Sequence, residues 1–404
     1  MVTNNSINSL NLQGVIQPQS GAYDVDELVK YLAPIHAKNV NAEFAVNSYV
    51  HGVTAVNNGY AGGLIYSPTQ QRIYFCPAQQ GSQTNWHYYN CLTGEIIAYA
   101  HGSSAVYDGY YGGAYDPTLN RIYFAPYFQS DEVTWQYISC DDGVVHDYTH
   151  GATVLCRGFR GAVYSKTQER IYFVPYQAAP STDWHYVRCS DGVVVAYTHG
   201  ATVVNNAYNG GVYSPKNDRI YFIPSYQSGQ EDWHYVDCSN GNIVAYTNDT
   251  GIAVSRAFSG GVYSPINNRI YLVPGNISDE ATWYYIDCDT NNIVGYNQSY
   301  SLTDNAYIGG VYSPTDDRIY LVPSAQYDQT DWHYIKCSDA TIISYTHVTA
   351  LGSYSGGTYD AINNRILFSP SGVAEETTWN YIQLYSQAEI APQIMSQSIF
   401  NKAP

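Results

Sequence analysis

The sequence predicts an all-β fold, a seven-bladed β-propeller with four antiparallel strands in each blade. The first observation is an Arg-Ile-Tyr-Phe-Ile-Pro run that begins at Arg219 and is followed by Trp233. This frame occurs seven times at intervals of 47 to 50 residues, and it contains all 7 tryptophans of the chain. The second observation is that each repeat holds four short β-branched and aromatic runs separated by turn residues. Repeated four-stranded antiparallel units of this kind favour closure into a propeller.

The repeat frame is defined by an arginine and a tryptophan in each unit. The arginines are Arg72, Arg121, Arg170, Arg219, Arg269, Arg318 and Arg365. The tryptophans are Trp86, Trp135, Trp184, Trp233, Trp283, Trp332 and Trp379. We expect each arginine to stack on an aromatic ring or to bond loop carbonyls between blades. We expect the tryptophans to pack between blades, with their indole N–H groups bonded to local acceptors.

The fourth repeat illustrates the four expected strands. The first strand is Gly210–Ser214, and the second, Arg219–Ile223, ends at Pro224, which cannot donate a backbone hydrogen bond. The third is Trp233–Cys238 and, after a Ser-Asn-Gly turn, the fourth is Ile243–Thr247. The second and third strands carry large apolar residues on both faces, so we expect each sheet to lie between two others.

The closure of the ring is predicted from what the seventh repeat lacks. After Trp379 the chain supplies a third strand, but Pro392 stands where earlier repeats place a tyrosine of the fourth strand. A segment that resembles the missing strand, Val46–Gly52, precedes the first repeat. We therefore expect this N-terminal segment to complete the last blade and to latch the ring.

The predicted organisation is one repeat domain over residues 44–385 with a tail at each end. The N-terminal tail, 1–43, contains apolar residues spaced for a short amphipathic helix between Asp24 and Pro34. The C-terminal tail, 386–404, carries several apolar side chains. Both tails are candidates for anchoring a partner.

Composition limits the classes of function. The net charge is −17, and seven of the 17 basic residues belong to the repeat frame, so nucleic-acid binding is not expected. No apolar run is long enough to span a membrane. The first residues lack the cationic and apolar segments of a signal peptide, and we expect an intracellular, reducing environment.

Cysteines and histidines recur at fixed positions of the repeat. Six cysteines follow a tryptophan by five residues: Cys91, Cys140, Cys189, Cys238, Cys288 and Cys337. Equivalent positions of neighbouring blades are roughly 15 Å apart, whereas a disulfide needs Cα atoms within about 7 Å, so we expect buried thiols. For the same reason the histidines, which follow tryptophans or end fourth strands, are expected to be structural, and no metal site is predicted.

No catalytic pattern stands out. The sequence has no Gly-x-Ser-x-Gly elbow and no phosphate-binding loop, and its loop carboxylates form no evident pair. We therefore predict a non-enzymatic protein without a cofactor.

The informative positions are those at which the repeats differ. A glycine nine residues before each frame arginine is invariant, which the crowding of inner strands explains. The residues just before this glycine, and those four before it, vary between repeats and are expected to rim the central channel. The predicted binding residues are Asp108, Tyr111, Arg157, Arg160, Asn206, Asn209, Arg256 and Asn305.

The architecture resembles that of the WD40 and kelch propeller families, although neither the Trp-Asp ending nor the kelch spacing is present. The Tyr-Ser-Pro-x3-Arg-Ile-Tyr and Trp-His-Tyr runs are similar to uncharacterised propeller repeats of large DNA viruses and phages. That resemblance implies a virion or virus-surface role.

Three functions remain open. The first is a rigid disc that binds protein partners, including capsid proteins through the tails. The second is a lectin that stacks glycans on its loop aromatics. The third is an enzyme that acts in the central channel.

Overall fold

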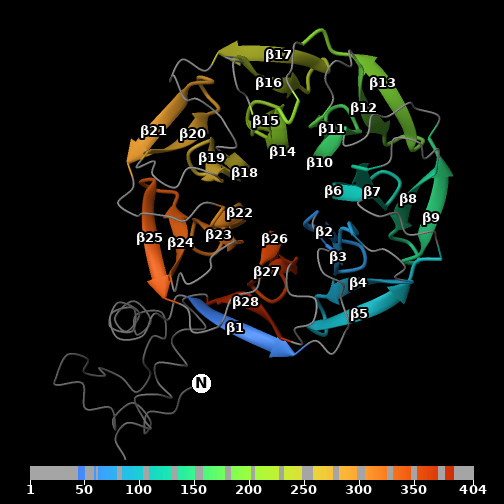
Figure 1. Cartoon of the computed structure of the whole chain (residues 1–404), viewed down its shortest axis with the longest axis horizontal. Coiled ribbons are helices and arrows are strands. Elements are labelled where there is room, and N and C mark those ends of the chain that lie inside the picture. The colour runs from blue at the N-terminus through green and yellow to red at the C-terminus, as the bar shows by residue number, and fades with distance from the viewer. Residues whose placement is uncertain are drawn as a thin grey trace, which may run out of the picture. The chain divides into compact units, whose positions relative to one another are not determined.

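The computed structural model confirms the fold class. It describes residues 44–50, 59–60, 62–79, 84–102, 109–128, 134–150, 158–177, 183–201, 205–226, 232–247, 258–275, 282–297, 305–324, 331–346, 353–371 and 378–385. These residues form seven four-stranded sheets, which Figure 1 shows as blades around a central channel. No helix in these ranges is long and apolar enough to cross a membrane.

Each blade has the same order of strands from the channel outward. The innermost strands are β2 (Leu64–Ser67), β6 (Tyr110–Asp116), β10 (Phe159–Ser165), β14 (Tyr208–Ser214), β18 (Phe258–Ser264), β22 (Tyr307–Ser313) and β26 (Tyr354–Asp360). The second strands are β3 (Arg72–Phe75), β7 (Arg121–Pro126), β11 (Arg170–Pro175), β15 (Arg219–Pro224), β19 (Arg269–Pro274), β23 (Arg318–Pro323) and β27 (Arg365–Pro370).

The two outer positions complete the sheets. The third strands are β4 (Asn85–Asn90), β8 (Thr134–Ser139), β12 (Asp183–Arg188), β16 (Asp232–Asp237), β20 (Thr282–Asp287), β24 (Asp331–Lys336) and β28 (Thr378–Leu384). The fourth strands are β5 (Glu95–Ala100), β9 (Val145–Thr149), β13 (Val193–Thr198), β17 (Asn242–Thr247), β21 (Ile293–Asn297) and β25 (Thr341–Thr346). The seventh sheet has the order β26, β27, β28 and β1 (Phe44–Val50). The role of β1 as a latch stays a prediction.

The expected strands of the fourth blade agree with the observed ones to within two residues. The largest difference is at the first strand, which begins at Tyr208 instead of Gly210. Tyr208 pairs with Pro224 across a register shift that precedes Gly211, so a β-bulge extends the strand. The antiparallel pairing places the first residue of the inner strand beside the end of the second strand, on one face of the disc.

The second strands form the core of the propeller. In β15 the four residues from Ile220 to Ile223 are 0% exposed, although their side chains alternate between the two faces of the sheet. Each face is covered by a neighbouring blade. This burial confirms that the sheets are packed face to face around the ring.

Tryptophans pack between blades as expected. The ring of Trp86 lies edge-on to Phe124 of the next blade, with centroids 6.0 Å apart, and Trp184 meets Phe222 in the same way at 5.6 Å. The expectation for their N–H groups was wrong in four cases: the indole nitrogens of Trp86, Trp135, Trp184 and Trp233 are buried without an acceptor in the described residues. Apolar packing, not hydrogen bonding, holds these rings.

The frame arginines stack on tyrosines, as predicted. In six blades the guanidinium carbon lies 4.2 to 4.5 Å from the ring centroid of a third-strand tyrosine. Arg219, which stacks on Tyr235, also donates to the amide oxygen of Asn291 in the next blade at 2.9 Å. In these six blades the repeated arginine is therefore part of the blade framework.

The histidines divide into two structural sets. The Nδ1 atoms of His234 and His333 lie 2.5 and 2.6 Å from the hydroxyl oxygens of Tyr208 and Tyr307, which belong to the innermost strands. The three described histidines that follow fourth strands, His101, His150 and His199, stack on tryptophans instead, and the rings of Trp135 and His150 have centroids 3.7 Å apart. In the described ranges no three His, Cys, Asp or Glu side chains converge to hold a metal.

The seven described cysteines are buried free thiols, as predicted, and they include the six that follow tryptophans. Burial raises the pKa of the Cys76 thiol to about 12, so this group is inert near neutral pH. Cys156 lies outside the described residues, as do the predicted helix between Asp24 and Pro34 and both tails.

Candidate functional site

The central channel is narrow because glycines line it. The volume of the channel is about 260 Å³. Its wall contains a Gly-Gly or Gly-Ala pair from every innermost strand except that of the first blade. A Cβ atom added to Gly112 would lie 2.7 Å from the Cα atom of Gly161 in the next blade. Backbones at this separation leave no room for side chains. At Gly112 the glycine therefore serves close packing, as expected, whereas at Gly63, Gly210 and Gly309 an added Cβ atom would meet nothing within 4 Å and the positive φ is what favours glycine.

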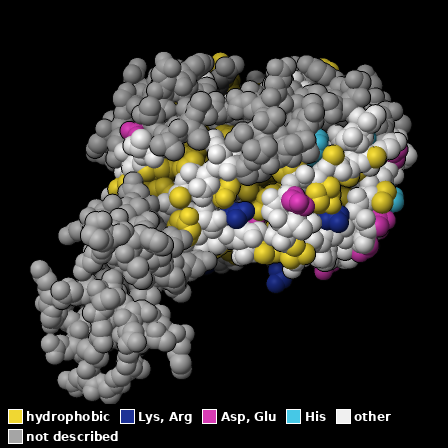
Figure 2. Space-filling view, turned by 90° about the horizontal axis from the view of Figure 1, so that it is seen from below, with side chains coloured by type: hydrophobic (Ala, Val, Ile, Leu, Met, Phe, Trp, Pro, Cys, Tyr) yellow, Lys and Arg dark blue, Asp and Glu magenta, His cyan; other side chains and the backbone are white. Residues whose placement is uncertain are grey.

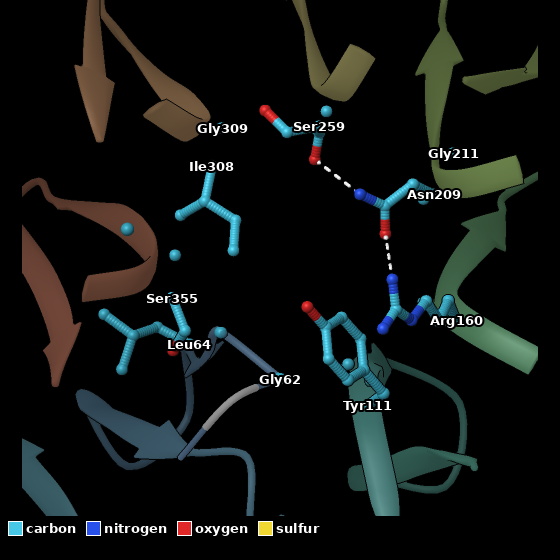
Figure 3. Close-up of a pocket in the computed structure, with 18 of the residues that line it drawn as sticks. Gly62, Leu64, Tyr111, Arg160, Asn209, Gly211, Ser259, Ile308, Gly309 and Ser355 are labelled. Atoms are coloured by element: carbon cyan, nitrogen blue, oxygen red, sulfur yellow. Dashed lines mark hydrogen bonds between the residues drawn. The ribbon is translucent and has the colours of Figure 1, made fainter. Parts of the chain in front are cut away.

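The residue before this glycine differs from blade to blade and forms the mouth of the channel. In Figure 3, Tyr111, Arg160, Asn209 and Ser259 follow one another on one side of the opening, and Ile308 and Ser355 lie on the other side. The seven repeats therefore present an asymmetric rim.

Hydrogen bonds link these rim residues across blades. A guanidinium NH group of Arg160 donates to the Asn209 amide oxygen at 3.4 Å, and the Asn209 amide nitrogen donates to the carbonyl of Ser259 at 3.1 Å. The Ser259 hydroxyl in turn donates to the carbonyl of Tyr307 at 2.8 Å. One chain of contacts thus fixes the rim over four consecutive blades.

A larger cavity opens from this rim on the same face, and we call it the mouth cavity. Its volume is about 680 Å³. The described residues that line it are Tyr111, Arg160, Tyr176, Asn206, Asn209, Ser225, Tyr226, Phe258, Ser259, Gly275, Asn305, Tyr307, Ile308 and Ser324. They offer phenol, amide, hydroxyl and guanidinium groups, and include no Asp, Glu, His or Cys.

The sequence-predicted residues meet in this cavity where the structure describes them. Tyr111, Arg160, Asn206, Asn209 and Asn305 all line it. The other three, Asp108, Arg157 and Arg256, lie outside the described residues. The binding role of the set stays a prediction.

Two of these residues owe their position to backbone geometry. Asn206 and Asn305 have φ values of 61° and 58°, in the left-handed region that asparagine tolerates better than most residues. Each of the two residues precedes an innermost strand. Its backbone N–H donates to a carbonyl that follows the second strand of the preceding blade. The turn therefore holds both amides at the cavity wall.

Arg160 is the only cation among the described lining residues of the cavity. Its guanidinium carbon lies 4.1 Å from the ring centroid of Tyr176, 4.5 Å from that of Tyr111 and 5.4 Å from that of Tyr127. Burial disfavours its charge, but the surrounding tyrosines outweigh burial and raise the pKa of Arg160 above its ordinary value. The group therefore stays cationic.

Sequence reasoning missed the aromatic residues that follow the second strands. Tyr127 and Tyr176 come directly after the frame proline, and Tyr226 comes one residue later. The signal was present, because the position after this proline also varies: Ala78, Tyr127, Tyr176, Ser225, Gly275, Ser324 and Ser371. This position therefore varies among the repeats like the residue before the invariant glycine, and the same comparison predicts that its side chains are available for binding.

Comparison with known proteins supports the fold alone. No family model matches the chain, and no curated protein matches its sequence. Among solved structures, a chain from a structure described as "Crystal Structure of Mitotic Checkpoint Complex" is similar with a TM-score of 0.59 and 8% sequence identity. The similarity covers 93% of this chain and 98% of that chain, so it extends over the propeller as a whole.

Proposed function

We propose that this propeller is a non-enzymatic interaction protein whose protein partner docks over the mouth cavity. The observation that carries the proposal is the convergence of positions that vary among repeats on one cavity, while the frame around them repeats. The hydrogen-bonded rim from Arg160 to Tyr307 gives the partner a preformed surface. Preformed surfaces bind with a smaller entropic cost.

The described lining residues favour binding over catalysis. They supply no carboxylate, imidazole or thiol that could exchange a proton near neutral pH. Their tyrosine and arginine side chains are the types that dominate protein interfaces. An enzyme in the channel has no supporting feature among these residues.

The experiment compares two faces of the same molecule. The tagged protein and its Tyr226→Ala and Asn305→Lys variants are purified from the native source, and co-purifying proteins are quantified. Both changes lie in the mouth cavity, where Tyr226 is 38% exposed. We expect at least one partner to be depleted about tenfold, which corresponds to a loss of about 1.4 kcal/mol.

The matched control is Ile266→Ala. Ile266 is 50% exposed and lies in the turn between β18 and β19, on the opposite face. Partner recovery should be unchanged in this variant. Equal recovery from the cavity variants and the wild type would refute docking at the mouth.

A carbohydrate-binding role is the second candidate. Phe128 and Tyr226, at the ends of the second strands of two blades, expose 41% and 38% of their surface, and exposed rings are platforms for sugars. A glycan array tests this role. Glycan binding that is lost in both Phe128→Ala and Tyr226→Ala would favour a lectin. An array on which the wild type binds no glycan would contradict the carbohydrate-binding role.

The virion role rests on the resemblance of the repeat to viral propellers. Figure 2 shows charged side chains scattered singly over the described surface on one side of the molecule, which gives that role no electrostatic support. Co-sedimentation of the protein with virus particles, lost on deletion of residues 388–404, would support a capsid contact through the tail. Recovery of the full-length chain only outside particles would exclude it.

A further inference from the structure

The environment of Arg160 is unusual because the charge lies in a cage of tyrosines. The guanidinium is close to the rings of Tyr111, Tyr127 and Tyr176. The first two rings belong to the preceding blade, and the third belongs to the same blade as Arg160. Such contacts stabilise a cation by about 0.5–2 kcal/mol each. They act through the flat faces of the rings and leave the edge of the guanidinium, where its N–H groups point, to other partners.

The hydrogen-bonding capacity of Arg160 is underused. A guanidinium has five N–H donors. With the described residues it forms two bonds, to the Asn209 amide oxygen at 3.4 Å and to the Tyr127 hydroxyl at 3.5 Å, and both are long for N–H···O bonds. The Nε atom is buried and has no acceptor in the described part of the chain.

No described carboxylate neutralises this charge. The ion pairs between described residues do not include Arg160, although the chain has 34 acidic residues. An enclosed cation without an anionic partner is costly, and the cost falls when a carboxylate pairs with it. The frame arginines differ: Arg219, for example, bonds an amide oxygen at 2.9 Å.

The rest of the cavity wall suits a peptide. Asn305 is exposed, and its side-chain amide offers one acceptor and a donor group, which match the N–H and C=O of a peptide bond. Ser225, after the second strand of the fourth blade, and Ser324, after that of the sixth, add hydroxyls. Tyr226 provides an exposed ring for an apolar part of the ligand.

We propose that the mouth cavity recognises an acidic side chain of a protein partner, whose carboxylate pairs with Arg160. This inference deepens the proposed function and rests on it for the nature of the partner. A carboxylate accepts two parallel N–H bonds from a guanidinium and so supplies acceptors that the described residues around Arg160 do not.

The first test uses defined probes with the full chain. Calorimetric or NMR titration compares the peptide acetyl-Gly-Glu-Gly-amide, its glutamine analogue and glucuronate. We expect the glutamate peptide to bind at least about tenfold more tightly than the glutamine peptide, because hydrogen bonds to charged groups are the stronger ones. Equal binding of the two peptides, or binding of neither, would overturn the proposal. Tighter binding of glucuronate than of the glutamate peptide would overturn the choice of a protein ligand in favour of an acidic sugar.

The second test gives Arg160 a carboxylate of its own. Asn209→Asp changes the shape of the side chain little and places an anionic oxygen where Asn209 already accepts from Arg160. The change also removes the bond from the Asn209 amide nitrogen to the Ser259 carbonyl, so a modest fall of the melting temperature is expected in a variant that stays folded. We expect binding of the glutamate peptide to fall at least about tenfold. Unchanged binding in this folded variant would contradict recognition by Arg160.

The matched control is Arg170→Met. Arg170 is in the same blade and also stacks on a tyrosine, Tyr186, at 4.4 Å, but it does not line the cavity. Peptide binding should be unchanged. A comparable loss in this variant would show that the Asn209 effect comes from general loss of structure.

The two proposals can fail separately. Equal binding of both peptides, with partner recovery still lost in Tyr226→Ala and Asn305→Lys, would overturn the carboxylate inference alone. Glutamate-specific binding, with partner recovery unaffected by these two variants, would overturn docking of the partner at the mouth and leave carboxylate recognition intact.

Discussion

The two faces of the propeller differ in how strictly the blades repeat. On one face the first and second strands of every blade are joined by a turn whose last residue has a φ of 49° to 56°. These residues are Gln71, Asn120, Glu169, Asp218, Asn268, Asp317 and Asn364. At the mouth of the channel, on the other face, the residues before the invariant glycine are of six types.

The difference teaches which constraint acts at each face. The turns are fixed by local geometry and by contacts with the next blade: the Asn217 amide, for example, donates to the carbonyl of Cys288 at 2.6 Å. The rim residues project into the channel mouth, where the backbone does not depend on their identity. Variation at the mouth is therefore compatible with the fold and available for recognition, whereas the last turn residue varies only among Asn, Asp, Gln and Glu.

The largest effect on stability is expected from replacing the invariant glycine of the channel wall. In Gly112→Ala the new Cβ atom would lie 2.7 Å from the Cα atom of Gly161, and φ is already +91°. We expect the free energy of unfolding to fall by about 4 kcal/mol or more, as urea denaturation would measure.

Gly210→Ala separates the two causes of this loss. Gly210 has a φ of +102°, but nothing lies within 4 Å of an added Cβ atom. Its cost should be only that of the left-handed backbone, about 1–2 kcal/mol. Similar losses in the two variants would show that close approach of the blades does not require glycine.

The pH dependence of stability should follow the repeated histidines. Burial lowers the pKa of His234 and of His333 to about 4, from an ordinary value of 6.5. The unfolded chain therefore binds more protons between these values, so stability is complete above about pH 6.5 and is lost as the pH falls toward 4. Each histidine should contribute roughly 3 kcal/mol to this loss.

Glutamine provides the matched replacement. In the second blade Gln136 occupies the equivalent position and accepts from the Tyr110 hydroxyl. The double variant His234→Gln/His333→Gln should therefore keep the fold and show a smaller decrease of the unfolding free energy between pH 6.5 and 4. An unchanged pH profile in urea denaturation would mean that other groups control acid stability.

The smallest effect is expected for the stacked arginines. Arg121 and Arg170 lie 4.3 and 4.4 Å from the ring centroids of Tyr137 and Tyr186. Arg121→Met and Arg170→Met should each reduce the unfolding free energy by about 1 kcal/mol, and by the same amount. Clearly different values in thermal or urea denaturation would show that the blades are not equivalent where their sequences repeat.

Much of the fold could be predicted because one short frame carries it. The frame proline ends the second strand in six blades, and the apolar residues on both sides of β15 require a neighbour on each face. Four of the indole N–H groups were predicted wrongly, because hydrogen-bond geometry depends on atoms of the next blade. The β-bulge at Tyr208 was missed for a similar reason, since it depends on the pairing with Pro224.

The sequence by itself determined the number of blades, the strand order within a blade and the positions that are free to vary. These properties are local or periodic, and they can be read by comparing one repeat with the next. Only the tertiary structure decided which variable positions meet. Arg160 and Tyr176 belong to two segments of the third blade, and Asn305 precedes the sixth. Closure of the ring nevertheless places them around one cavity. That proximity depends on the curvature of the whole ring, which no single repeat encodes.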